Sequence, residues 1–143
     1  MNIRFRDLID QTYYFPTEEF SLDQSNLLFH GVSLMDLVEK YGSPLKFTYL
    51  PKISQNIGLA KKWFADAMEK HGYTGKYYYC YCTKSSHFRH VMHEALRNDI
   101  HIETSSAFDL DIVEHLKKEG WVKDDTYVIC NGFKREAYVD NIA

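Results

Sequence analysis

The sequence predicts an α/β protein built from parallel strands, and three observations lead to this fold class. Short apolar stretches alternate with helical segments from residue 45 onward, in the order β-α-β-α-β-α-β-α. The connections between the strands are themselves helical, as crossovers between parallel strands are. The run YYYCYC at residues 77–82 is apolar on both faces, which is typical of a parallel strand that is covered on each side.

Composition agrees with a soluble globular protein of one modest domain. The chain has 143 residues, of which 45% are hydrophobic, 15% aromatic and 26% charged. A net charge of -3 gives no indication of a nucleic-acid partner. Three cysteines, an odd number, make a disulfide framework improbable and favour a reducing compartment. No apolar run is long enough to span a membrane and no signal peptide is present, so we expect a cytoplasmic protein without a membrane partner.

Residues 1–44 are expected to form an N-terminal segment that precedes the βα units. Residues 15–17 (Phe-Pro-Thr) indicate a turn. A short helix is predicted to begin after Ser33, a favourable N-cap with Asp36 three residues on, and to end at Gly42.

Residues 45–143 are expected to form successive βα units. We predict strands at residues 45–50, 77–83, 100–104 and 127–130, and helices at residues 53–70, 87–97, 107–118 and from 135 onward. The helix at 53–70 carries its apolar residues, from Ile57 to Met68, on one side. Two architectures fit this order: an open doubly wound sheet, or part of a barrel. Four strands cannot close an eight-stranded barrel, so the second architecture requires an incomplete barrel.

Ionisable and polar residues follow three of the predicted strands. Lys84 ends the first, Glu103 the second and Asn131 the third. The carboxyl ends of parallel strands meet at one edge of a sheet, where functional groups collect. A partly desolvated lysine amine can attack a carbonyl and form a Schiff base, which is how pyridoxal phosphate is held.

Each of these residues also has a structural interpretation. Lys84 taken alone is a solvated lysine at the end of a strand, and Glu103 alone is an exposed carboxylate. Ser105 and Ser106 are good N-caps for the helix at 107–118.

Several motifs resemble those of the fold-type III pyridoxal-phosphate enzymes, the alanine-racemase-like barrels. The run Tyr81-Cys-Thr-Lys84-Ser-Ser resembles their Y-x-x-K-x-N strand end, with Ser86 in place of the usual Asn. YGSPL at 41–45 resembles the YGTPL segment of the decarboxylase branch. Residues 102–110 resemble the following strand. CNGFKREAY at 130–138 is similar to the CNGYKDREY segment of biosynthetic arginine decarboxylases, although the Asp before Arg-Glu is missing.

The resemblance implies a function. Lys84 would hold pyridoxal 5'-phosphate as a Schiff base, and Glu103 would pair with the lysine amine once substrate has taken the aldehyde. Asp109 matches a second acidic position of the family, although a structural role on its helix is the better interpretation from the residues. The reaction would convert arginine to agmatine and CO2, a step of polyamine biosynthesis, in a homo-oligomeric enzyme. The family's phosphate-binding loop and C-terminal β-domain lie beyond residue 143. The chain would therefore be the N-terminal part of a longer lyase, inactive by itself.

Three alternatives remain. Ornithine, lysine and diaminopimelate decarboxylases share the lysine strand, so the substrate could be another basic amino acid. The chain could be a catalytically silent truncated homologue or an interaction protein. It could also be a metal-binding module that uses a group of histidines and cysteines, namely His87, His90, His93, His101, Cys80 and Cys82. Positions i and i+3 share a helix face but i+6 does not, which disfavours the metal site.

Overall fold

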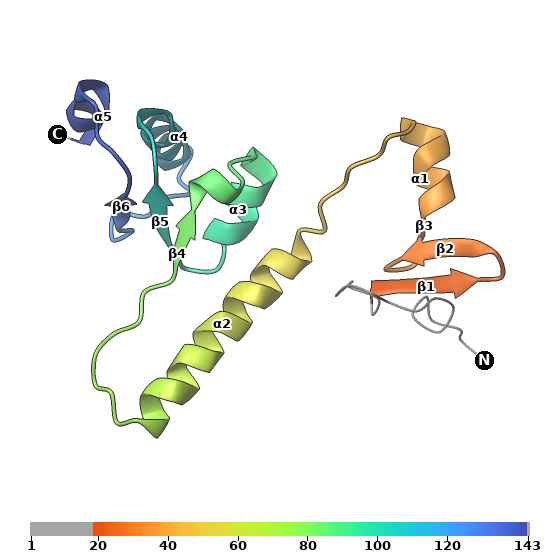
Figure 1. Ribbon diagram of the computed structural model, residues 1–143, viewed down its shortest axis with the longest axis horizontal. Helices are drawn as coiled ribbons and strands as arrows, with labels where there is room; N and C mark the ends of the chain where they lie inside the picture. Colours follow the sequence, from red (N-terminus) through yellow and green to blue (C-terminus); the bar gives the residue numbers. More distant parts are fainter. Residues whose placement is uncertain (1–18, 143) are drawn as a thin grey trace. The chain divides into compact units, whose positions relative to one another are not determined.

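The structure, a computed structural model, describes residues 19–142 (Figure 1). The chain divides into two compact units, Met1–Thr48 and Tyr49–Ala143. The turn predicted at residues 15–17 lies outside the described residues. Within residues 19–142, no helix has both the length and the apolar character needed to cross a membrane.

The first unit contains a three-stranded antiparallel sheet that the sequence did not predict. Its strands are β1 (Phe20–Asp23), β2 (Asn26–Phe29) and β3 (Val32–Ser33), in the order β1-β2-β3. Two-residue turns join them and place Gln24, His30 and Gly31 at φ of 54°, 49° and 81°. Tight hairpins need such positive φ values. Neither turn is an Asn-Gly or Asp-Gly pair, so the local signal for a hairpin was weak.

Helix α1 (Leu34–Tyr41) follows the sheet and confirms the predicted caps. The hydroxyl of Ser33 accepts a hydrogen bond from the backbone N–H of Asp36 at 3.2 Å. Gly42 ends the helix with a φ of 87°, and its N–H donates to the carbonyl of Val38 at 2.7 Å. Both ends of this helix are therefore decided by residues next to it in the sequence.

The second unit is built on a parallel three-stranded sheet in the order β4-β5-β6, which confirms the α/β class. Its strands are β4 (Cys80–Cys82), β5 (His101–Thr104) and β6 (Val128–Cys130). Its helices are α2 (Pro51–Lys70), α3 (Arg89–Leu96), α4 (Ala107–Lys118) and α5 (Glu136–Ile142). The register aligns Cys82 with Glu103, and Glu103 with Ile129.

Residues 45–50 form an irregular segment, so the strand predicted there is wrong. A β-strand is stabilised by hydrogen bonds to a neighbouring strand, and a strand-like pattern alone does not supply that neighbour. No strand among the described residues pairs with this segment.

One face of the parallel sheet is buried under helices and the other is open. Ile102 of β5 is 0% exposed and belongs to a core cluster to which α2, α3 and α4 contribute Ile57, Met92, Ala95, Leu96, Val113 and Leu116. On the opposite face, Ile129 is 48% exposed, and Cys80 and Cys82 are half-buried. The prediction that residues 77–82 are covered on both sides is therefore wrong within the described residues.

Helix α2 contacts the core mainly through its N-terminal half. Ile57 is 2% exposed, whereas Trp63 and Phe64 are 63% and 51% exposed. The ring of Phe64 stacks on Tyr77 with a centroid distance of 4.1 Å. The amphipathic pattern predicted the helix correctly, but most of its predicted apolar side does not reach the core.

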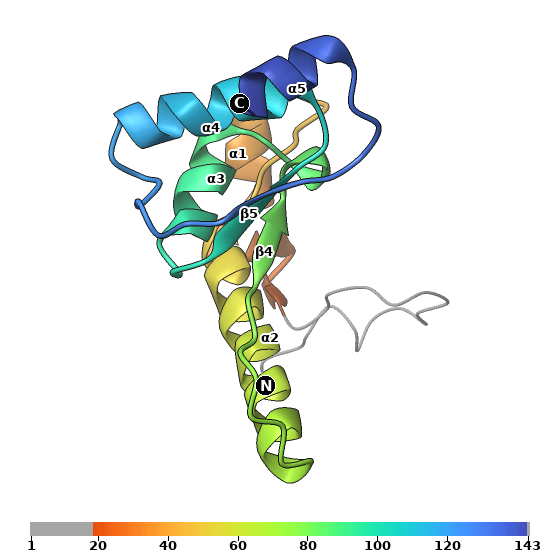
Figure 2. The same ribbon diagram turned by 90° about the vertical axis from the view of Figure 1, so that its left-hand side faces the viewer.

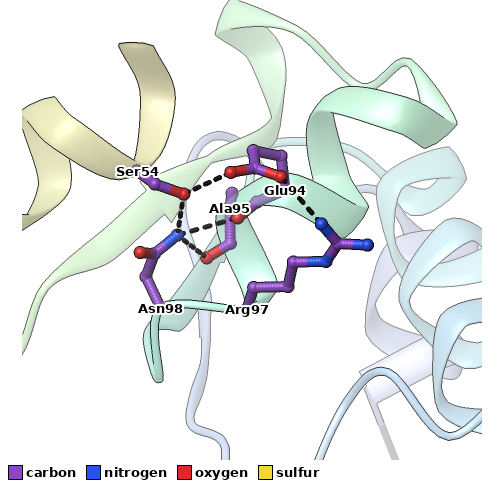
Figure 3. A network of polar contacts seen from close by, with 5 residues as sticks. All are labelled: Ser54, Glu94, Ala95, Arg97 and Asn98. Carbon is purple, nitrogen blue, oxygen red and sulfur yellow. Dashed lines mark hydrogen bonds and ion pairs between the residues drawn. The ribbon is translucent and has the colours of Figure 1, made fainter. Parts of the chain in front are cut away.

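A polar network fixes the N-terminal half of α2 to α3 (Figure 3). The hydroxyl of Ser54 donates to Glu94 Oε1 at 2.5 Å, and the side-chain amide of Asn98 donates to Ser54 at 2.8 Å. Arg97 lies 3.3 Å from the second carboxylate oxygen of Glu94. Because Glu94 is half-buried, these contacts supply the partners that burial of a carboxylate requires.

Two leucines of the second unit test where its core lies. Leu116 is 3% exposed and Leu59 is 42% exposed. We expect Leu116→Ala to lower the free energy of unfolding by about 2–5 kcal/mol, because it leaves a cavity. The matched change Leu59→Ala should cost less than about 1 kcal/mol. Denaturant titrations of both variants measure the difference, and equal losses would contradict the one-sided core.

Candidate functional site

The carboxyl edge of the parallel sheet gathers the polar residues that the sequence places after its strands. Lys84 follows β4, Glu103 lies near the end of β5, and Asn131 directly follows β6. The backbone register places β4 and β6 on either side of β5, so these residues share one edge. The structure therefore brings the three predicted strand ends together.

A hydrogen-bonded turn holds the backbone around Lys84, which lies in the 3₁₀ helix Thr83–Ser85. The hydroxyl of Tyr81 donates to the carbonyl of Ser86 at 2.9 Å, so that one bond spans the lysine. The hydroxyl of Ser85 donates to the carbonyl of Cys82 at 2.7 Å. Local hydrogen bonds of this kind fix a turn that is not part of a sheet or an α-helix.

The side chain of Lys84 is exposed, so the partial desolvation expected for an activated lysine is not present within the described residues. Among residues 19–142, its ammonium group has no hydrogen-bond or ion-pair partner. Its neighbour Thr83 is fully buried and donates to the backbone carbonyl of Glu103 at 3.1 Å. The turn is thus fastened to β5 while the amine stays available for another group.

Glu103 is half-buried on the open face of the sheet. Its Oε1 accepts a hydrogen bond from the side-chain amide of Asn131 at 2.6 Å. Within the described residues, no ion pair joins Glu103 to Lys84. The expected pairing of the two side chains remains a prediction for the ligand-bound state.

Asn131 and Gly132 form the turn after β6. Gly132 has a φ of 86°, and a Cβ there would lie 3.2 Å from the carbonyl oxygen of Ser105. The positive φ and the close approach both favour glycine. The sequence gave no signal for the contact of Asn131 with Glu103, which lies 28 residues earlier.

Asp109 and Ser106 form a capping box at the start of α4, which confirms the prediction of a serine cap. The carboxylate of Asp109 accepts from the backbone N–H groups of Ser105 and Ser106 at 2.8 and 3.0 Å. Asp109 is only 6% exposed, so it is a buried cap and does not lie on the helix surface. Burial raises the pKa of Asp109, but the hydrogen bonds from Ser105, Thr83 and Ser106 outweigh burial and hold the pKa below its usual value.

Tyr138 of α5 is a structural residue of the site that the sequence did not single out. Figure 2 shows α5 next to α4, beyond the carboxyl ends of the strands. The Tyr138 hydroxyl lies 3.0 Å from Thr104 Oγ1 and 3.1 Å from the carbonyl oxygen of Asn131. Burial raises the pKa of this phenol, so it stays neutral and can donate. The sequence offered two indirect signals for it, its place in a predicted helix and at the end of the segment CNGFKREAY.

The histidines and cysteines do not converge on a metal site. Among the described residues, no group of three His, Cys, Asp or Glu side chains has the geometry to hold a metal ion. His93 stacks on Trp121 at 4.0 Å, whereas His87 and His90 are exposed. Burial, and to a lesser degree the charge of Glu103, raises the pKa of Cys80, which keeps the thiol neutral.

The fold and the site together define a protein class: an α/β chain whose parallel sheet carries a lysine, a glutamate and an asparagine at its carboxyl edge. No family model, curated protein or solved structure matches the chain. The site's chemistry therefore carries the functional argument.

The buried cap of α4 leads us to predict how the free energy of unfolding depends on pH. Because the pKa of Asp109 is lowered by folding, its carboxylate stabilises the folded chain above the unfolded-state pKa, about 4. This stabilisation is lost as the pH falls through the lower folded-state pKa. We expect Asp109→Asn to reduce the free energy of unfolding by about 1–2 kcal/mol at pH 7. In this variant the free energy of unfolding should also decrease less than in the wild type as the pH is lowered to 3.

Denaturant titrations at pH 7, 5 and 3 measure this dependence. The control is Asp125→Asn, which alters an exposed carboxyl that makes no ion pair within the described residues. An Asp109→Asn variant that keeps the wild-type acid dependence would show that the cap does not act through its charge.

Proposed function

We propose that the chain is the N-terminal part of a pyridoxal-phosphate-dependent amino-acid decarboxylase, with arginine as substrate and Lys84 as the residue that holds the cofactor. The observation that carries this proposal is the state of Lys84. Its backbone is fixed by hydrogen bonds at the carboxyl edge of the sheet, while its amine is exposed and unpaired within the described residues. A lysine that must exchange its bonding partner needs this combination of a fixed backbone and a free amine.

The donor set of the edge fits the cofactor's aldehyde. Lys84 provides the amine, and Glu103 provides a half-buried carboxylate on the adjacent strand. When bound, pyridoxal phosphate supplies a conjugated ring that delocalises the electron pair left by departing CO2. Glu103 would attract the lysine ammonium after the amine has left the aldehyde, and would keep its proton near the substrate.

The arrangement of the second unit supports a barrel as the architecture of the whole enzyme. The strands β4, β5 and β6 follow one another in the sheet, and the core contributed by α2, α3 and α4 lies on one face. Barrels of βα units have this one-sided covering, whereas doubly wound sheets carry helices on both faces. Further strands would then complete the sheet and enclose its open face.

Arginine is the substrate that the sequence of the last turn favours. CNGFKREAY at 130–138 is similar to the corresponding segment of arginine decarboxylases. Asn131 of this segment contacts Glu103, so the residues that favour arginine are attached to the proposed cofactor edge.

The proposal predicts a specific covalent adduct. The chain is incubated with pyridoxal 5'-phosphate, reduced with borohydride and digested, and the pyridoxyl group is located by mass spectrometry. We expect one dominant adduct, at Lys84, which Lys84→Arg abolishes and the control Lys76→Arg retains. Lys76 is also exposed but lies before β4, at the other end of the strand.

An adduct distributed over surface lysines, unchanged by Lys84→Arg, would overturn the proposal. The substrate is tested on the protein purified from its natural source. Agmatine formed from arginine supports arginine, and release of a different amine from another basic amino acid assigns that substrate.

A silent interaction protein is the second candidate, and the exposed apolar residues of α2 favour it. Trp63 and Leu59 are 63% and 42% exposed. Patches of this kind mark surfaces that another chain covers. Absence of any Lys84 adduct, together with concentration-dependent light scattering that Trp63→Ser removes, would support this candidate.

A further inference from the structure

Asn131 is fixed at both ends of its side-chain amide. Its Oδ1 accepts a hydrogen bond from the backbone N–H of Gly132 at 2.6 Å, and its Nδ2 donates to Glu103 Oε1 at 2.6 Å. A backbone N–H can only donate and a carboxylate can only accept. The two partners therefore allow one orientation of the amide, with the N–H group towards Glu103.

The backbone of Asn131 is fixed as well. Its N–H donates to the carbonyl of Thr104 at 2.8 Å, which continues the pairing of β5 with β6 past the end of the strand. Its carbonyl oxygen lies 3.1 Å from the hydroxyl of the buried Tyr138. These contacts leave the side chain no freedom to follow Glu103 if the carboxylate moves.

Glu103 has no other fixed partner within the described residues. Its carboxylate lies on the open face of the sheet, opposite Cys82 in the register. Cys80, two residues before Cys82 on the same face, has its pKa raised by burial and stays a neutral thiol. A glutamate side chain has three rotatable bonds, so a half-solvated carboxylate needs a hydrogen bond to stay in one position.

We propose that Asn131 is a positioning residue that holds the Glu103 carboxylate at the carboxyl edge of the sheet, where it acts on the amine of Lys84. This inference rests on the proposed function, because the amine is the group on which Glu103 would act. Asn131 itself need not touch cofactor or substrate, since both of its side-chain ends are occupied by the protein.

A set of variants separates positioning from structural support. Asn131→Ala removes the hydrogen bond, and Asn131→Asp keeps the acceptor for Gly132 but sets a second carboxylate against Glu103. The exchanged pair, Glu103→Gln with Asn131→Asp, restores the hydrogen bond in the opposite direction, with an amide at 103 and the carboxylate at 131. Asn56→Ala, at an exposed position of α2, is the control.

Two quantities are measured on the full chain: the Tm, and the rate at which pyridoxal 5'-phosphate forms the borohydride-trapped adduct at Lys84. We expect Asn131→Ala to lower the Tm by about 5 °C. It should also lower the adduct rate about tenfold, because the displaced carboxylate no longer accepts the proton that the attacking Lys84 amine loses. Asn131→Asp should lower both further. Glu103→Gln should form the adduct at the same rate as Asn131→Ala. A variant that combines the two changes should form it no more slowly than either single variant.

The exchanged pair tests whether the carboxylate must stand at position 103. If Asn131 positions a carboxylate, the exchanged pair recovers the Tm and leaves the adduct rate about tenfold low. Recovery of both quantities would show that the rate does not need a carboxylate at position 103, and an unchanged rate in Asn131→Ala would show that the hydrogen bond does not matter for it. Either result would overturn positioning. A wild-type chain without any Lys84 adduct would refute the proposed function and this role with it, while the Tm series would still report the hydrogen bond.

Discussion

Burial of one face of a three-stranded parallel sheet is the constraint on which the second unit depends. Ile102 in the central strand is 0% exposed, and residues of α2, α3 and α4 complete the same core cluster. A shift of β5 by one residue would place its apolar side chains on the open face, at the cost of that burial. The hydrophobic core therefore fixes the register of the strands, and the register fixes which side chains meet at the carboxyl edge.

The open face can carry polar groups because it is not packed against helices. Glu103 and Cys82, which faces it from β4, are half-buried, so a carboxylate there keeps contact with solvent and loses less hydration than it would in the core. The same strand thus serves two purposes. Ile102 and Thr104 point into the interior and are fully buried, while Glu103 between them points to the other face.

Hydrogen bonds organise several groups at the carboxyl edge, whereas the amine of Lys84 has no partner within the described residues. Tyr138 and Asn131 fix the end of β6, and the capping box with Asp109 fixes the start of α4. Two lysines elsewhere in the unit are paired, Lys61 with two backbone carbonyls and Lys123 with Asp99. Lys84 thus carries an unpaired amine on a turn whose backbone is fixed by hydrogen bonds.

The sequence by itself determined the features that depend on near neighbours. The caps at Ser33 and Ser106, the helical segments and the polar ends of the strands all follow from residues a few positions apart, and the structure has them. The tertiary structure alone decided whether residues 45–50 find a strand partner, how much of α2 reaches the core, and that Asn131 contacts Glu103. The physical reason is that pairing, burial and this hydrogen bond join residues far apart in the chain, so no local pattern specifies them.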